Sequence, residues 1–531
     1  MVLCLPRPSL ALRIPENFTI RSLDLVILPE GMKKGKTLKE RFGRILAPLV
    51  GQPLSTGSQK ALIARAEFLL GNGGWGEVRV FLPAQSFRSG HLTIGIAIPQ
   101  LGRMTFSNPS RVSTGFLSGT LSEEGVVPGR TLDIDSIEQG LYDLGQIPGI
   151  AHAAGTLSAG SEPFSSDLTV GITPADPFTG SALEVDDYGY AYTGSIMLNA
   201  TGEISSGLFS GDQFIVLASS SFFGMNSGTV SYSVPVSYNS WRLGADFNAM
   251  NYALGYGLAP FATTSNANVY KTLGASGDNT TIDLWTSRHV GDDATSGTLK
   301  VMGILKNLID NYGAGVDNQR TIGGGSMELE GSATRSIGSF AADLTDMEYD
   351  LVQGPESSTL NPFYYSSSGL HNFATENLSE TFFLNAQRTG LFALREGGQQ
   401  EIGAGAIDPM LQAVLGGMGN VRALAAGVAF GNNLYDATAT LTRLSPLWNG
   451  QLGSSLFFDW GRVTGNGANY SGQGPGAEES WTGPHLFAKL DLAVPVGPLP
   501  ANLAAGMPAL VGGNTAGTIP VEFWFSLGLK E

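Results

Sequence analysis

The sequence predicts a membrane all-β protein, an antiparallel transmembrane β-barrel preceded by two small α/β domains. Apolar residues at helical spacing are concentrated before residue 176. After that point, apolar and polar residues alternate in stretches of about ten residues between Gly-rich turns, as they do in barrel strands. Only 14% of the residues are charged, compared with about 25% in typical soluble domains. Much of the surface is therefore expected to face lipid.

The first small domain is expected over residues 17–98, after a short N-terminal extension, residues 1–16. Apolar residues recur every three or four positions in two segments, which predicts two helices, and alternate in the segments on either side. The result is a β-α-α-β-β unit. The expected strands cover residues 18–27, 75–82 and 91–98, and the expected helices cover residues 38–50 and 62–70.

The second small domain, residues 99–175, repeats this plan in a shorter form. Ile137, Leu141 and Leu144 form the apolar stripe of a short helix, which Asp133 or Asp135 could cap. The Pro148-Gly149 pair ends that helix. Two strands are expected after it, over residues 151–157 and 167–172.

The barrel is expected over residues 176–531. In Trp241–Asn251, for example, Trp241, Leu243 and Phe247 share one parity and polar residues take the other. A soluble β-sandwich also alternates, but its polar face tends to carry exposed Lys and Glu, whereas Ser, Thr, Asn and Gly dominate here. The segment Tyr188–Leu198 is predicted as a strand whose tyrosines form an interfacial aromatic girdle.

Several function classes are disfavoured. The net charge of −16 argues against a nucleic-acid partner, and the single cysteine, Cys4, allows no intrachain disulfide. The five histidines show no metal-binding spacing, and no glycine run has the setting of a phosphate loop. We therefore expect no enzyme, no cofactor and no metal site. The first fifteen residues lack the basic start of a secretory signal, which indicates a truncated or misassigned start; a cytoplasmic protein is the alternative explanation.

Six segments, in this order along the chain, resemble the transporters of two-partner secretion systems, which export haemagglutinin-like and haemolysin-like proteins. They include the Leu-Pro-x-Gln turn at Leu82 and the Phe-x-Asp-x-Gly element at Phe457. The six segments are Phe81–Ile96, Asp133–Ile172, Val185–Ser219, Ser231–Gly255, Gly416–Arg443 and Leu456–Val463.

The resemblance implies two POTRA (polypeptide-transport-associated) domains in the periplasm and a barrel of 16 strands in the bacterial outer membrane. It also implies a loop, at about residues 411–433, that folds into the lumen. Val421 and Arg422 would lie at the loop tip, and Arg422 would pair with Asp459, beside Gly461, on the wall. Where the family has Gly-Tyr after this Val-Arg, the chain has Ala423-Leu424.

The resemblance further implies export of an unfolded exoprotein with a β-helical fold. The POTRA domains would capture it by strand addition, with Phe81, Leu82, Pro83 and Gln85 as interface candidates; alternatively these domains are spacers, and Pro83 and Gln85 only shape a turn. Other partners would be outer-membrane lipid and the barrel-assembly machinery. The rival functions are membrane-protein assembly or lipoprotein export by a related barrel, a passive porin-like channel, and a soluble adhesin.

Overall fold

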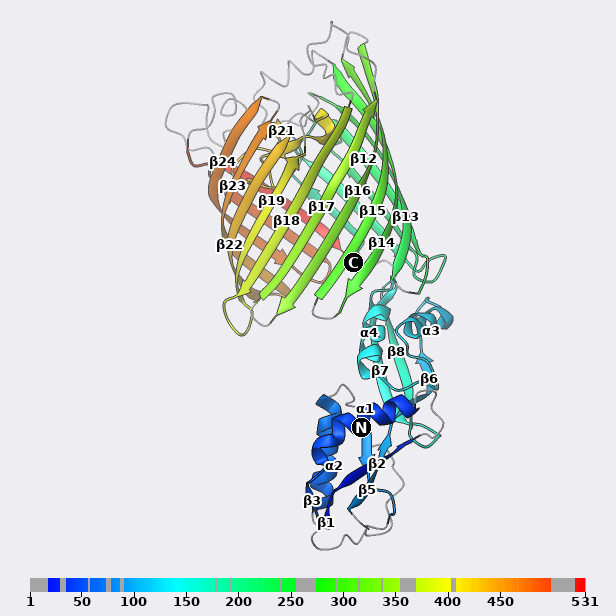
Figure 1. Ribbon diagram of the computed structural model, residues 1–531. Helices are drawn as coiled ribbons and strands as arrows, with labels where there is room; N and C mark the ends of the chain where they lie inside the picture. The colour runs from blue at the N-terminus through cyan, green and yellow to red at the C-terminus, as the bar shows by residue number, and fades with distance from the viewer. Residues whose placement is uncertain are drawn as a thin grey trace. The chain divides into compact units, whose positions relative to one another are not determined.

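The computed structural model divides the chain into two compact units, Met1–Ala175 and Asp176–Glu531, which are described separately below (Figure 1). The first unit contains two small α/β modules and the second is the barrel. The structure describes residues 18–28, 35–55, 58–72, 78–85, 90–176, 180–190, 193–222, 224–238, 240–254, 274–292, 295–312, 316–335, 338–353, 369–402, 407–465, 467–497 and 521–530.

The first module is a three-stranded sheet covered by two helices. Its strand order is β2-β5-β4, with β2 and β5 parallel and β4 antiparallel to β5. Leu25, Phe42, Leu70 and Ile94 belong to its buried core. The expected β-α-α-β-β order is observed, although residues 1–17 and 73–77 lie outside the described residues. The elements are β1 (Phe18–Thr19), β2 (Ser22–Leu28), α1 (Gly35–Leu46), η1 (Ala47–Leu49), β3 (Pro53–Leu54), α2 (Gln59–Asn72), β4 (Arg79–Phe81) and β5 (His91–Ala97).

The second module has the same topology, with strand order β6-β8-β7 and its own core around Leu117, Leu144 and Leu168. The sequence prediction missed its first strand and first helix. The helix α3 is rich in Gly, Ser and Thr, so its apolar stripe is short, but its start signal is present, because the Ser113 side chain accepts a hydrogen bond from Phe116 N. The elements are β6 (Gln100–Ser107), α3 (Thr114–Glu123), α4 (Ile134–Gly145), β7 (Ile150–Ala159) and β8 (Ser165–Pro174).

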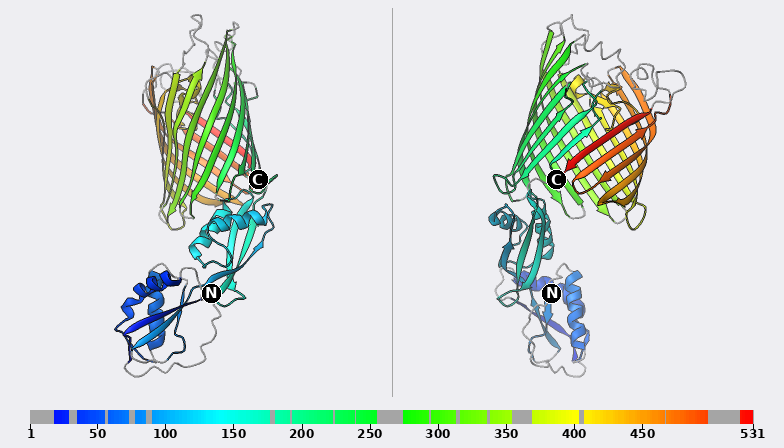
Figure 2. Two further views of the ribbon diagram at one scale, coloured as in Figure 1. Left: turned by 45° about the vertical axis from the view of Figure 1, so that its right-hand side comes forward. Right: turned by 180° about the vertical axis from the view of Figure 1, so that it is seen from behind.

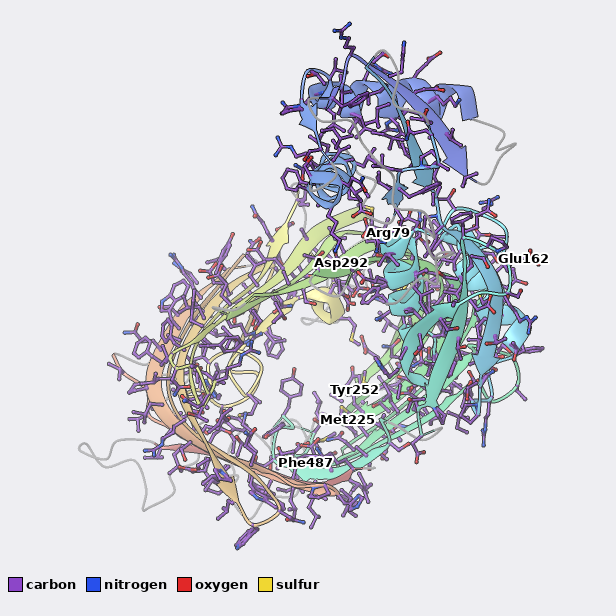
Figure 3. The ribbon with its side chains drawn as sticks, turned by 90° about the horizontal axis from the view of Figure 1, so that it is seen from below. Arg79, Glu162, Met225, Tyr252, Asp292 and Phe487 are labelled. Carbon is purple, nitrogen blue, oxygen red and sulfur yellow. The ribbon has the colours of Figure 1, made fainter. Side chains whose placement is uncertain are left out.

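Sixteen antiparallel strands form a closed transmembrane barrel, which confirms the predicted fold class. The ring closes where β26 pairs with β9, and Figure 3 shows the strands enclosing the lumen. The strands are β9 (Ala182–Asp186), β10 (Met197–Ser205), β11 (Gln213–Ser220), β12 (Met225–Pro235), β13 (Trp241–Ala253), β14 (Ala275–Gly291), β15 (Thr295–Tyr312), β16 (Val316–Arg335), β17 (Gly338–Gln353), β18 (Gly369–Phe383), β19 (Gly390–Glu401), β22 (Asn433–Leu447), β23 (Gly450–Gly465), β24 (Ala468–Thr482), β25 (Leu486–Ala493) and β26 (Glu522–Lys530).

The two faces of the wall differ in chemistry, as the alternation predicted. On β13, Leu243 and Phe247 are 53% and 47% exposed on the outer face. The inner face carries polar networks: Tyr252 (labelled in Figure 3) donates its hydroxyl to Asp310 of β15 at 2.6 Å, and Ser231 donates to Asp246 at 2.6 Å. An apolar outside and a polar inside are the pattern of a barrel in lipid.

The segment predicted as a strand with a tyrosine girdle is organised differently. β9 ends at Asp186 and β10 begins at Met197. Between them, Tyr188 lies edge-on to Trp524 at a centroid distance of 6.4 Å, on the inner face of β26. Gly194, with φ +113°, adopts a conformation that an extended strand does not use. The girdle prediction for Tyr188 is therefore wrong, because alternation in an aromatic segment also fits a loop that packs inside the barrel.

Within the part of the chain that the structure describes, no helix combines the length and the apolar character needed to cross a membrane.

The second module contains a carboxylate whose charge opposes folding. Burial raises the pKa of Asp143, in the last turn of α4, to about 6; a hydrogen bond from Gln139 lowers the pKa, and nearby Glu124 raises it. Because the folded state then binds this proton more tightly than the unfolded state, the contribution of Asp143 to stability is greatest below about pH 4 and is lost as the pH rises through about 6.

We expect Asp143→Asn to remove this fall and to stabilise the module at pH 7 by about 1–2 kcal/mol, allowing for partial solvent exposure. Hydrogen exchange of the α4 amides in the full chain, measured between pH 4 and 8 and corrected for intrinsic rates, would test it. Equal stability of the variant and the native chain at pH 7 would contradict the prediction.

Candidate functional site

A hairpin lies inside the barrel between β19 and β22. Its short strands, β20 (Ala413–Leu415) and β21 (Ala429–Gly431), pair antiparallel and follow a single 3-10 turn, η3 (Pro409–Leu411). The yellow segment within the ring of strands in Figures 1 and 2 includes this hairpin. Leu415, Val421 and Leu424 of the loop form one buried cluster with Phe457 and Val463 of the wall. The hairpin is thus packed against β23 and β24.

Arg422, at the tip of the hairpin, is buried, and all three nitrogens of its guanidinium donate hydrogen bonds to carboxylates of the wall. Its Nε and Nη2 donate to the two carboxylate oxygens of Asp459 on β23, each at 2.9 Å. Its Nη1 donates to Asp491 on β25 at 3.1 Å and to Glu478 on β24 at 3.2 Å. The two parallel bonds to Asp459 are the planar, bidentate geometry that only an arginine can make.

The charges around Arg422 nearly balance. Lys489 of β25 lies 3.0 Å from Glu478 and 3.6 Å from Asp491, so two cations face the carboxylates of Asp459, Glu478 and Asp491. The guanidinium also lies over the ring of Phe457, with its carbon 3.2 Å from the ring centroid. In a dehydrated site such contacts are stronger than in water. We call the side chains of Arg422, Phe457, Asp459, Glu478, Lys489 and Asp491 the lumen lock.

Backbone contacts fix the tip as well. Arg422 N donates to Asp459 Oδ2 at 3.0 Å, and the indole Nε1 of Trp524, on β26, donates to Arg422 O at 2.8 Å. Thr438 of β22 donates its hydroxyl to the other oxygen of Asp459 at 3.0 Å. Side chains from five consecutive wall strands, β22 to β26, therefore converge on one loop residue and its acceptor.

Two glycines directly opposite each other make room for the tip. Gly461 of β23 pairs with Gly472 of β24. A Cβ added at Gly461 would meet Val421 Cγ2 at 2.7 Å, and one at Gly472 would meet Leu424 Cδ1 at 2.3 Å. The loop side chains thus occupy the space that wall side chains would fill. Leu424, which stands where the family that the sequence resembles has tyrosine, fits the gap over Gly472.

Comparison with known proteins shows likeness in structure alone. No family profile and no curated protein sequence matches the chain. CdiB from Escherichia coli is 16% identical with a TM-score of 0.71, over 99% of this chain and 92% of that one. The chain has the CdiB fold. CdiB from Acinetobacter baumannii is 16% identical with a TM-score of 0.66, over 98% and 91% of the two chains. BamA from Haemophilus ducreyi lacking POTRA domains 1-3 is 13% identical with a TM-score of 0.54, over 97% and 100%.

The observed fold, two small α/β modules followed by a closed barrel of 16 strands, is the one that the sequence resemblance implied. The structure brings together the four residues predicted at the contact between the loop tip and the wall, Val421, Arg422, Asp459 and Gly461. Sequence reasoning missed Glu478, Asp491 and Trp524. Asp491 and Trp524 both have the inward parity of their strands, but parity alone does not say which lumen residues meet.

The candidates in the first module lie in the other unit and have mainly structural contacts. Leu82 is in the core, and the Phe81 ring covers Gly95, where an added Cβ would meet it at 2.4 Å. Gln85 donates to Thr93 O and accepts from Thr93 N, both at 2.7 Å, so its amide continues the sheet beyond the end of β4. Pro83 O accepts a further bond from Gln85 at 3.3 Å. Among the described residues, no His, Cys, Asp and Glu side chains form a cluster suited to a metal ion.

Arg422→Lys should keep a positive charge but lose the bidentate pair, which weakens the seating of the hairpin by about 1–3 kcal/mol. Arg422→Ala should cost about 3–5 kcal/mol, because it leaves buried carboxylates without their cation. Hydrogen exchange at Gly417 N and Val428 N, which bond within the loop, would report both effects. Arg443→Ala, at an exposed arginine of β22, is the control. Native protection in Arg422→Ala would show that the lock does not hold the loop.

Gly472→Ala should displace Leu424 and weaken loop seating by about 1–3 kcal/mol. The double variant Gly472→Ala/Leu424→Ala should recover part of this loss, so the double-mutant cycle should show a coupling above about 0.5 kcal/mol. Gly323→Ala, where an added Cβ would meet nothing within 4 Å, is the matched control. Additive effects of the two substitutions would argue against direct packing of Leu424 on Gly472.

Proposed function

We propose that this protein is an outer-membrane translocator, which receives an unfolded partner exoprotein in the periplasm and passes it through the barrel. The observation that carries the proposal is the hairpin held in the lumen by Arg422. The buried Arg422 binds carboxylates of three strands, those of Asp459, Glu478 and Asp491, so noncovalent bonds alone hold the hairpin at its tip. A noncovalent lock can open and close again, as a conduit for a large polypeptide requires.

The outer face of the wall supports a location in a membrane. Large apolar side chains such as Leu284, Leu305 and Leu456 are 63%, 51% and 65% exposed, and they suit lipid rather than water. Closed barrels of this kind belong to bacterial outer membranes. In this arrangement the small modules stand in the periplasm, where an exoprotein first meets them.

The modules suit capture by strand addition. β7 is a ten-residue strand of mostly small, exposed residues, and among the described residues it pairs with β8 alone. Its other edge therefore offers backbone N–H and C=O groups to an extended chain. In the first module, the Gln85 amide already occupies the main-chain groups of Thr93, so we place capture at β7 rather than at this turn.

Assembly of membrane proteins is the second candidate, favoured by the similarity to BamA at a TM-score of 0.54. The two functions differ in the product. A translocator releases a soluble exoprotein into the medium, whereas an assembly factor leaves its client in the membrane. Fractionation of cells after expression with a candidate client distinguishes them.

We expect Arg422→Ala to abolish export of the partner exoprotein while the barrel still assembles. Export would be followed by immunoblot of the medium, and assembly by heat-modifiable gel mobility. Arg443→Ala is the control for loss of a positive charge and should export normally. Normal export by Arg422→Ala would remove the lock from the mechanism.

Deletion of residues 17–172 should leave a membrane-inserted barrel that exports nothing, because the capture surface is gone. The same two measurements apply. If the shortened protein still exports, the modules are spacers and substrate recognition lies in the barrel.

A further inference from the structure

The turn between β10 and β11 presents two large apolar side chains that the mechanism above does not use. Leu208 is 80% exposed and Phe209 is 65% exposed. They are adjacent in the chain, at the end of the barrel where β10 finishes and β11 starts. Exposing two adjacent apolar side chains to water is unfavourable, so we expect lipid or another protein surface to cover them.

The turn is held rigidly. Asp212 Oδ2 accepts hydrogen bonds from Leu208 N and Phe209 N, both at 3.1 Å. Ser206 N donates to Asp212 O at 2.8 Å, and Ser206 Oγ accepts from Gly211 N at 3.0 Å. Arg242 of β13 also donates to Gly211 O at 2.9 Å. The two side chains are therefore displayed by a fixed backbone and cannot simply fold away.

Asp212 also connects the turn to the outer face of the wall. Tyr232 donates its hydroxyl to Asp212 Oδ2 at 2.9 Å. Register puts Tyr232 opposite Phe214, and Phe214 opposite Ile204, and these two residues are about one-third exposed on the outer face. A Cβ added at Gly207 would meet Ile204 Cγ2 at 3.1 Å, so the turn leans on that face. Tyrosines with an apolar ring and a polar tip mark the membrane interface.

We propose that the turn Ser206–Asp212 is a lipid anchor, in which Leu208 and Phe209 enter the boundary between headgroups and acyl chains of the leaflet at this end of the barrel. The occupant is lipid because Ile204 and Phe214, at the ends of β10 and β11 next to this turn, are exposed on the lipid-facing side of the wall. The inference rests on the proposed membrane location, but it does not depend on what the barrel exports.

The test places an environment-sensitive NBD fluorophore on single cysteines, Leu208→Cys or Phe209→Cys, in the full chain with Cys4→Ser. The protein is reconstituted in phosphatidylcholine/phosphatidylethanolamine vesicles that contain lipids with nitroxides at the headgroup or at a shallow or deep acyl position. The matched control is His485→Cys, an exposed position in the turn between β24 and β25 at the same end.

We expect emission at shorter wavelength at 208 and 209 than at 485, and at least twofold stronger quenching by headgroup and shallow nitroxides than by deep ones. Emission and quenching equal to those at 485 would overturn the proposal. Short-wavelength emission that lipid nitroxides do not quench and that grows with protein concentration would indicate that a second copy of the chain covers Leu208 and Phe209. That result would also overturn the proposal. Export, scored in the same variants, separates failure of the anchor from failure of the translocator function.

Discussion

The bidentate pair between Arg422 and Asp459 is the contact on which the interior of the barrel depends. Both groups are buried, and each would be costly to bury alone. Together, with Asp491, Glu478 and Lys489 around them, they form a network in which each charge has a partner. The pair fixes the loop at its tip, and the buried cluster around Leu415 and Leu424 packs the rest of the hairpin against the wall.

The wall makes this pair possible in two ways. Alternation sends every second side chain inward, which brings Asp459 and Asp491 into the lumen from strands two positions apart in the sheet. Because the barrel is closed, those strands cannot shift in register. The positions of the carboxylates are therefore set by strand register and not by side-chain packing. Trp524 then ties the loop tip to β26, the strand that closes the ring with β9.

Sequence patterns predicted the fold well where one physical rule dominates. Period-2 alternation indicated the barrel, and helical stripes located α1, α2 and α4. The rule failed for Tyr188, because an inward loop and an outward strand can carry the same spacing, and for α3, whose small residues leave a weak stripe. Within the lock, Arg422 and Asp459 were predicted from the resemblance to a family and from parity. Glu478 and Trp524 were missed, since contacts across strands far apart in sequence depend on register that local patterns do not encode.

The paired glycines beneath the loop tip have one more effect. With no side chains at Gly461 and Gly472, and with their main-chain groups bonded within the sheet, the floor of this part of the lumen is smooth. A hairpin that swings away would uncover bare backbone at these two glycines, bordered by the apolar side chains of Phe457 and Val463. The two glycines that let the hairpin fit closely would then also leave this strip of the wall without side chains that obstruct a passing polypeptide.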